Sequence, residues 1–171
     1  MFMQSNNRMR FHKAFFFSST FLAVFIPLLM KAPTTNDAAR NKARVEAGFD
    51  KWSSGTGSFF ELLSEDVRWT IAGNSPFSRT YGGKKEFMDA VIAPLNARLA
   101  SIIVPKVRRI YADGDTVIAL WDGIARASDG QPYNNTYAWF MKFKDGRIVD
   151  VVAFFDTGEL ADLWNRVPSP K

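Results

Sequence analysis

Three Asp-Gly steps divide the second half of the chain into strand-like segments, and they constrain the fold more than any other sequence feature. The steps are Asp113-Gly114, Asp129-Gly130 and Asp145-Gly146. Both residues of such a step tolerate the positive φ angles of tight hairpin turns, and β-branched or aromatic residues flank each step. We therefore predict four consecutive antiparallel strands in residues 103–156, forming a curved meander.

Helical spacing dominates the region before this meander. In residues 38–52 apolar side chains recur on one helical stripe. Residues 84–100 repeat the pattern around Pro94, which removes one backbone hydrogen bond and is expected to kink that helix. Between the two, Ser58 and Glu61 form a capping box for a short helix.

A strand at residues 67–71 and a terminal helix at residues 158–165 complete the predicted elements, and Asp156 is expected to cap the terminal helix. The order helix, helix, strand, helix, four strands, helix is typical of an α+β domain. In such a domain the helices cover one face of an antiparallel sheet.

The first 35 residues read as a segment and linker separate from the domain, which we expect to span residues 36–167 before a tail at 168–171. A basic stretch precedes an apolar run at residues 14–30, a pattern typical of an export signal or a membrane anchor. We expect a periplasmic or secreted protein, or one tethered to a membrane through this run. Translation from Met30 would instead leave a cytoplasmic domain.

The chain has no cysteine, and its only histidine is His12, in the N-terminal segment. Disulfide bonds and thiolate nucleophiles are therefore excluded. The domain also contains no histidine for a Ser-His triad or for the usual zinc sites. Any proton transfer would use Asp, Glu, Tyr or Lys. We expect neither a metal nor an organic cofactor.

The net charge of +5 belongs to the N-terminal segment rather than to the domain. Four of the 22 basic residues lie before Pro33, where there is no acidic residue, so 18 basic and 17 acidic residues remain. A domain so nearly neutral gives no electrostatic basis for nucleic-acid binding, and we expect no such partner.

Several short segments, taken with the element order, resemble one known superfamily. They are LLSEDVRW at 62–69, YGGK at 81–84, KDGRI at 144–148 and FFD at 154–156. In combination they resemble the SnoaL-like proteins of the ketosteroid-isomerase or nuclear-transport-factor-2 superfamily, over about residues 38–164. The resemblance implies a cone in which a curved sheet wraps against three N-terminal helices and encloses a small, often apolar molecule.

The same resemblance implies a range of activities, because this fold hosts isomerases, polyketide cyclases, epoxide hydrolases, dehydratases and members without catalysis. Aligned with limonene epoxide hydrolase, the chain places Asp122 on one catalytic aspartate. The enzyme's other catalytic positions are not matched, since they are occupied here by Leu120, Ala153, Trp69 and Ile71. Only the fold, the pocket location and Asp122 carry over.

Strand alternation predicts the lining of the pocket. If Asp122 points inward, Leu120 and Ile124 do as well, because alternate residues of a strand share a face. The other lining residues expected are Trp69, Ile71, Asn135, Tyr137, Trp139, Ala153 and Phe155. The predicted interior is apolar and aromatic, with Asp122, Asn135 and Tyr137 as its polar groups, which is the usual composition of a small-molecule site.

Two hypotheses of function follow, and the sequence does not decide between them. In the first, the protein binds a small hydrophobic molecule, and Asp122, with a pKa raised by apolar walls, acts as general acid or base of an isomerase, cyclase, dehydratase or hydrolase. Tyr137 would then donate a hydrogen bond to a substrate oxygen. The alternative for Asp122 is a carboxylate satisfied by Arg126, Tyr137 or a backbone amide, or lying in water at the mouth.

In the second hypothesis the domain catalyses nothing. It holds a ligand, or it pairs with a second copy as a homodimer through the outer face of the sheet. The outward residues expected to form that face are Ala119, Trp121, Ala138 and Phe140.

Overall fold

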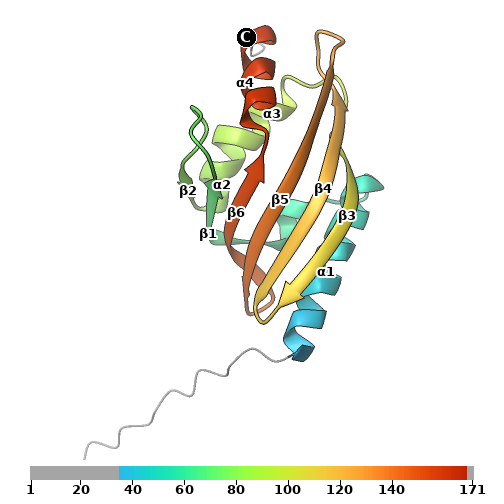
Figure 1. The fold of residues 1–171 in the computed structure, drawn as a ribbon, viewed down its shortest axis with the longest axis vertical. Helices are drawn as coiled ribbons and strands as arrows, with labels where there is room; N and C mark the ends of the chain where they lie inside the picture. Colours follow the sequence, from blue (N-terminus) through green and yellow to red (C-terminus); the bar gives the residue numbers. More distant parts are fainter. Residues whose placement is uncertain (1–34, 169–171) are drawn as a thin grey trace, which may run out of the picture. The chain divides into compact units, whose positions relative to one another are not determined.

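In the computed structural model, which describes residues 35–168, six strands form one sheet in the order β2-β1-β6-β5-β4-β3 (Figure 1). Four of them are the predicted antiparallel meander: β3 (Val104–Asp113), β4 (Thr116–Arg126), β5 (Pro132–Lys144) and β6 (Arg147–Phe155). The apolar run at residues 14–30, with the export and tether predicted from it, lies outside the described residues.

The other two strands extend the sheet beyond β6. Strand β1 (Leu63–Ile71) runs parallel to β6, and the short β2 (Thr80–Gly82) pairs antiparallel with β1. The predicted strand at 67–71 is therefore the second half of a longer one. The sequence analysis did not identify β2, which lies within the loop before the third predicted helix.

The Asp-Gly steps form the hairpin turns that were predicted from them. Between β5 and β6, Asp145 and Gly146 have φ angles of +51° and +77°. Gly114, between β3 and β4, has a φ of +55°, and Gly130, between β4 and β5, has a φ of +86°. Positive φ at these positions is what allows the chain to reverse within a few residues.

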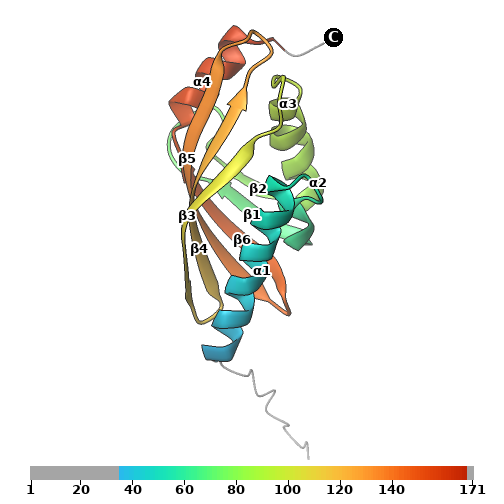
Figure 2. The ribbon, with the colours of Figure 1, turned by 90° about the vertical axis from the view of Figure 1, so that its right-hand side faces the viewer.

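Helices cover one side of the sheet, and Figure 2 shows α1, α2 and α3 on that side. Helix α1 (Thr35–Ser53) is followed by a single 3₁₀ turn, η1 (Phe59–Leu62). Helix α4 (Thr157–Arg166) follows β6. The predicted α+β class, with helices on one face of a curved sheet, is confirmed.

The third predicted helix consists of three consecutive segments: α2 (Lys84–Phe87), a π-helical turn η2 (Met88–Ile92) and α3 (Ala93–Asn96). Pro94 explains the change of helix type, because it has no N–H to donate and its ring occupies the space of a regular turn. The preceding N–H, that of Ala93, donates to the carbonyl of Met88, five residues earlier.

Two predicted caps are present. Ser58 and Glu61 make both hydrogen bonds of a capping box at η1, and the Asp156 carboxylate accepts hydrogen bonds from the N–H groups of Gly158 and Glu159 at the start of α4. Between residues 35 and 168, no helix is both long and apolar enough to cross a membrane.

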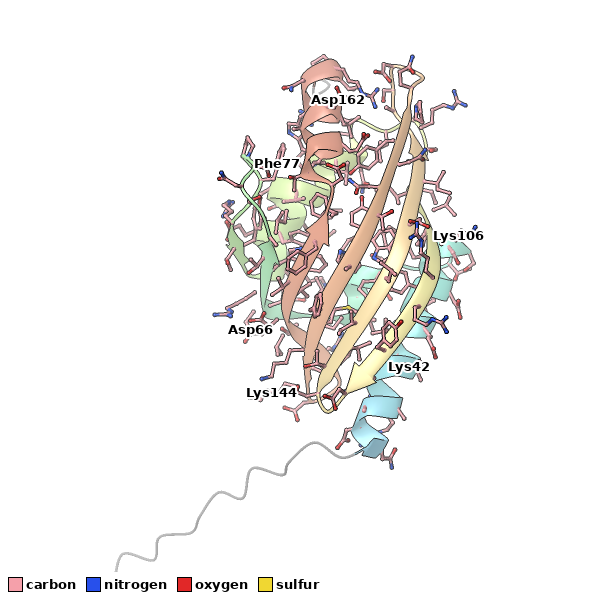
Figure 3. The ribbon with its side chains drawn as sticks, in the orientation of Figure 1. Lys42, Asp66, Phe77, Lys106, Lys144 and Asp162 are labelled. Carbon is pink, nitrogen blue, oxygen red and sulfur yellow. The ribbon has the colours of Figure 1, made fainter. Side chains whose placement is uncertain are left out.

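The hydrophobic core lies between the helices and the inner face of the sheet. On β5 every second residue from Tyr133 to Phe143 is buried, and on β4 the buried residues are Val117, Ala119, Trp121, Gly123 and Ala125. Side chains of the described residues are drawn in Figure 3. This alternation places the odd-numbered residues of both strands on the inner face.

Candidate functional site

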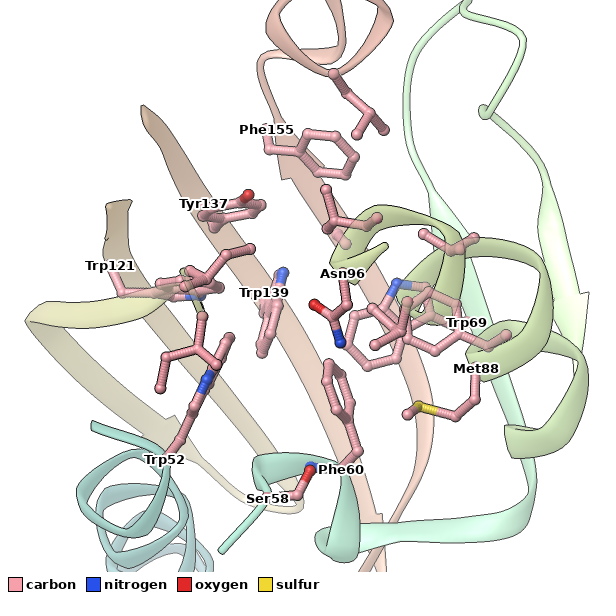
Figure 4. Close-up of a pocket in the computed structure, with 18 of the residues that line it drawn as sticks. Trp52, Ser58, Phe60, Trp69, Met88, Asn96, Trp121, Tyr137, Trp139 and Phe155 are labelled. Atoms are coloured by element: carbon pink, nitrogen blue, oxygen red, sulfur yellow. The ribbon is translucent and has the colours of Figure 1, made fainter. Parts of the chain in front are cut away.

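A cavity of about 340 Å³ lies between the inner face of the sheet and the helices (Figure 4). Four strands, β1, β4, β5 and β6, contribute to its walls, and all the helical elements contribute as well. The volume is at the lower end of the range of small-molecule sites, which is about 300–1,000 Å³. A compact ligand of one to three rings suits such a space.

Aromatic rings form most of the wall, and they support one another. The Trp121 and Tyr137 rings stack with centroids 4.1 Å apart, and the Trp69 and Phe87 rings stack at the same separation. The Trp139 ring contacts one ring of each pair at a steep angle, with its centroid 4.7 Å from that of Trp121 and 5.1 Å from that of Trp69. Stacked and edge-to-face contacts of this kind hold each ring in place, so the wall is preformed.

Exposed residues mark the mouth of the cavity. Gly55 and Ser58 lie on one side, in the connection between α1 and η1. Asn96 at the end of α3 and Ile102 before β3 are the other exposed lining residues. Ile102 is 62% exposed, so the mouth has an apolar edge.

Two tyrosine hydroxyls supply polar groups inside the cavity. The hydroxyl oxygens of Tyr133 and Tyr137 are 3.2 Å apart, within hydrogen-bonding distance. Burial raises the pKa of Tyr137 well above its ordinary value, and the neighbouring Tyr133 raises it further. Burial also raises the pKa of Tyr133. Both hydroxyls are therefore protonated at neutral pH.

The Tyr137 ring packs directly against the backbone of Gly123, where any other residue would place a Cβ atom. A Cβ atom at this position would come within 3.0 Å of Tyr137 Cε2 and Ile103 Cγ2, and within 3.1 Å of Trp121 Cζ3. Glycine inside a strand commonly marks such a close approach. The absence of a side chain here lets Tyr137 lie flat against Trp121.

Six of the predicted site residues are found in the wall of the cavity: Trp69, Ile71, Tyr137, Trp139, Ala153 and Phe155. The positions of these residues were predicted correctly because they lie on β1, β5 and β6, and the inward-facing residues of these three strands were identified correctly from their alternation. Their role in binding a ligand stays a prediction.

The expectation that Asp122 points inward is wrong. Its carboxylate lies on the outer face of the sheet, where Arg108 Nε donates to Oδ2 at 2.7 Å and the Thr136 hydroxyl donates to Oδ1 at 2.8 Å. The hydrogen bond from Arg108 is the largest cause that lowers the pKa of Asp122, and the one from Thr136 is the next. This is opposite to the raised pKa expected in an apolar pocket.

The register of the β4–β5 hairpin explains the error. Arg126 pairs with Pro132, so Asp122 pairs with Thr136 and shares its face with even-numbered residues of β5. A shift of one residue in register moves every side chain of a strand to the other face. Leu120 and Ile124, predicted to line the pocket with Asp122, therefore also face outward, and the predicted outward residues Ala119 and Trp121 are buried inside.

Asn135 is buried but does not line this cavity, contrary to expectation. Its Nδ2 donates to the backbone carbonyl of Asp156 at 2.8 Å, and its Oδ1 accepts from the backbone N–H of Asp156 at 2.9 Å. Both halves of the amide are thus used to fasten the end of β6 to β5, at the point where α4 begins.

Other lining residues were not among the predicted site. Trp52 and Phe87 lie on helix faces that the sequence analysis assigned to the core, so helical spacing could have found them. Trp121 was missed through the register error, and Tyr133 because it lies beyond the part of β5 that was considered. Phe60 follows the capping residue Ser58 and carries no separate signal.

Acidic and basic side chains are missing from the cavity wall that the described residues form. None of the 22 lining residues, all within the described part of the chain, is Asp, Glu, Lys, Arg or His. Residues 35–168 also contain no cluster of three or more His, Cys, Asp or Glu side chains that could hold a metal ion. Hydrogen bonding and apolar contact are therefore what this wall offers to a ligand.

Comparison with known proteins agrees with this architecture. The family model described as SnoaL-like domain matches residues 42–151. No curated protein matches the chain significantly.

This chain aligns with nearly the whole length of several solved structures that have the same fold. Bal32a, from a soil-derived mobile gene cassette, is 21% identical with a TM-score of 0.63, over 75% of this chain and 99% of that one. An NTF2-like protein of unknown function from Burkholderia pseudomallei K96243 is 23% identical with a TM-score of 0.61, over 72% and 96%. TerC, co-crystallised with polyporic acid, is 17% identical with a TM-score of 0.56, over 72% and 97%.

Proposed function

Because the chain belongs to the family of SnoaL-like domains, we propose that its domain binds a small, uncharged, predominantly apolar molecule in the interior cavity. The composition of the wall supports this most strongly, since nine of its 22 residues are aromatic and none carries a charge. A charged ligand would lose its hydration without gaining an ion pair, which is costly in a wall of this kind. The complex of TerC with polyporic acid is consistent with small-molecule binding in this fold.

Binding is better supported than proton transfer. A general base must come within hydrogen-bonding distance of the proton that it removes, and none of the described residues brings a carboxylate, amine or imidazole to the cavity wall. Asp122, the candidate base, is engaged with Arg108 and Thr136 on the other side of the sheet. Tyr137 remains as a neutral hydrogen-bond donor to a ligand oxygen.

A pair of matched variants tests the location of binding. Ala153 lies in the cavity wall and Ala138 on the outer face of the adjacent strand, so Ala153→Leu narrows the cavity whereas Ala138→Leu adds the same atoms outside it. We expect Ala153→Leu to weaken the binding of an uncharged bicyclic probe by tenfold or more, measured by isothermal titration calorimetry. Ala138→Leu should leave the affinity unchanged.

Two results would contradict the proposal. One is the absence of binding of any uncharged bicyclic compound to the wild-type protein. The other is equal affinity in the two variants, with thermal unfolding showing that both are folded. A naphthoate anion serves as a further control and should bind more weakly than an uncharged analogue.

The outer face of the sheet supports a second function, pairing with another copy of the chain. Tyr111, Phe140 and Phe154 are 57%, 41% and 49% exposed, and the Phe140 and Phe154 rings pack together 5.8 Å apart. Ile118 pairs with both Tyr111 and Phe140 across the strands, so these apolar side chains are continuous. An exposed apolar surface of this kind commonly marks an interface.

We propose that this outer face forms a homodimer. Sedimentation velocity should give a dimer for the wild-type protein and a monomer for Phe140→Asp. Lys144→Asp, on the same face of β5 but next to the hairpin turn, is the control and should remain dimeric. A wild-type monomer at high concentration would contradict the dimer without affecting the ligand proposal.

A further inference from the structure

The polar groups inside the cavity include several hydrogen-bond donors. Ser58 and Asn96 lie at the exposed mouth, which leaves the two tyrosine hydroxyls and the tryptophan indoles in the interior. An indole N–H donates but cannot accept. Within the tyrosine pair either hydroxyl can donate to the other, and when Tyr133 donates to Tyr137, the Tyr137 O–H is free to donate.

Trp139 contributes a second donor. It lies in the middle of the wall and is 4% exposed, and no hydrogen bond among the described residues uses its indole nitrogen. Figure 4 shows this nitrogen at the end of the ring that is turned toward the space beside Tyr137 and Phe155. The Trp121 nitrogen differs, because it is enclosed by protein atoms and has no hydrogen-bond partner in residues 35–168.

Tyr137 and Trp139 are neighbours on the same face of β5, and their ring centroids are 6.1 Å apart. An acceptor atom between their polar ends, within hydrogen-bonding distance of each, would receive both hydrogen bonds. A carbonyl oxygen has two lone pairs in the plane of its substituents and suits two such donors. A carboxylate could also accept both bonds, but its charge would be buried without a cation in the wall.

From this arrangement we infer that the ligand is an uncharged carbonyl compound with a flat, apolar body, whose oxygen accepts hydrogen bonds from Tyr137 and Trp139. This inference rests on the proposed function of the cavity and narrows it to one chemical class. The aromatic wall contacts the body of the ligand, and the two donors fix its orientation. A buried donor that would otherwise lack a partner gains one when the ligand enters.

Two probes of the same shape separate the carbonyl from the body that carries it. They are 2-acetonaphthone and 2-isopropenylnaphthalene, in which a CH₂ group replaces the oxygen. Isothermal titration calorimetry of both with the wild-type protein should give about tenfold tighter binding of the ketone, the effect expected of one or two neutral hydrogen bonds.

The ratio of the two affinities is then measured in variants, because repacking affects both probes alike. Tyr137→Phe and Trp139→Phe should each lower the preference for the ketone to about threefold or less. Tyr81→Phe is the matched control, since Tyr81 is also a buried tyrosine but donates its hydroxyl to the Phe77 carbonyl, away from the cavity. It should keep the full preference.

The outcomes distinguish this inference from the function on which it rests. Equal affinity of the wild-type protein for both probes would overturn the carbonyl inference and leave the apolar binding site standing. Failure of both probes to bind would remove both. If a variant does not fold, the infrared carbonyl band of the ketone bound to the wild-type protein tests the two hydrogen bonds. A band shifted below its position in hexane supports the two donors, and an unshifted band refutes them.

Discussion

Adding one methyl group at Gly123 tests whether the packing around Tyr137 is as tight as the structure indicates. In Gly123→Ala the new Cβ would lie 3.0 Å from Tyr137 Cε2 and Ile103 Cγ2 and 3.1 Å from Trp121 Cζ3. These distances are shorter than van der Waals contact, and all three neighbours are buried. Overpacking of a core by a group of this size typically costs about 1–3 kcal/mol.

The loss of stability expected from overpacking is partly offset by a stabilising effect of the alanine. Replacing glycine by alanine within a strand reduces the entropy of the unfolded chain and stabilises by about 0.4–1 kcal/mol. The net expectation is a loss of about 1–2 kcal/mol in the free energy of unfolding. For a domain of this size that corresponds to a fall in Tm of about 4–8 °C, measured by differential scanning calorimetry.

The same substitution at a roomier strand position is the control. At Gly82, in β2, the only atom near a new Cβ is Glu86 Oε2 at 3.7 Å, so Gly82→Ala should be neutral or slightly stabilising. Because the Gly123→Ala methyl pushes the Tyr137 ring, the variant should also lose part of its preference for the ketone probe. Equal Tm values for the two alanine variants would refute the packing argument.

Three other predictions concern the polar groups of the sheet. Asp122→Asn should leave probe affinity unchanged and lower Tm by less than about 2 °C, because an exposed ion pair contributes little; a clear loss of binding would show that the outer face takes part in the site. Asn135→Ala should lower Tm by about 8 °C, since it removes both hydrogen bonds to the Asp156 backbone, together about 2 kcal/mol; an unchanged Tm would contradict its role in fastening β6 to β5. The raised pKa of Tyr137 means that the unfolded chain releases this proton first as the pH rises, so stability should be constant from neutral pH to about pH 9 and fall above about pH 10. The free energy of unfolding of Tyr137→Phe, measured by urea titration, should fall less steeply with pH over that alkaline range. Parallel curves for the variant and the wild-type protein would contradict the assignment.

Much of the fold was predictable because its signals are local. The Asp-Gly steps fix where the meander turns, and the capping box at Ser58 and the cap at Asp156 fix where η1 and α4 begin. On β5 the inner face is strongly aromatic and the outer face is mixed, so the alternation of residue types identified which side chains face inward.

The orientation of β4 was not predictable from its own residues. Its outer face carries Ile118, Leu120 and Ile124, which are as apolar as its inner face, so alternation gave no clear answer. Gly123 weakened the inner pattern further because it has no side chain to contribute. The face of Asp122 then depended on the number of loop residues between β4 and β5, which the position of Asp129-Gly130 does not specify.

The cavity itself depends on long-range packing. Its walls combine residues as distant as Trp52 and Phe155, and the π-helical turn that contributes Met88 and Val91 arises from Pro94. Sequence spacing assigned most of these side chains to the core but could not show that the core is hollow.

A crystal structure of the protein with 2-acetonaphthone tests the central claim most directly. The account predicts the ketone inside the cavity, with its oxygen within hydrogen-bonding distance of the Tyr137 hydroxyl and the Trp139 nitrogen. Aromatic side chains that fill the interior, or a ketone bound only on the outer face of the sheet, would contradict it.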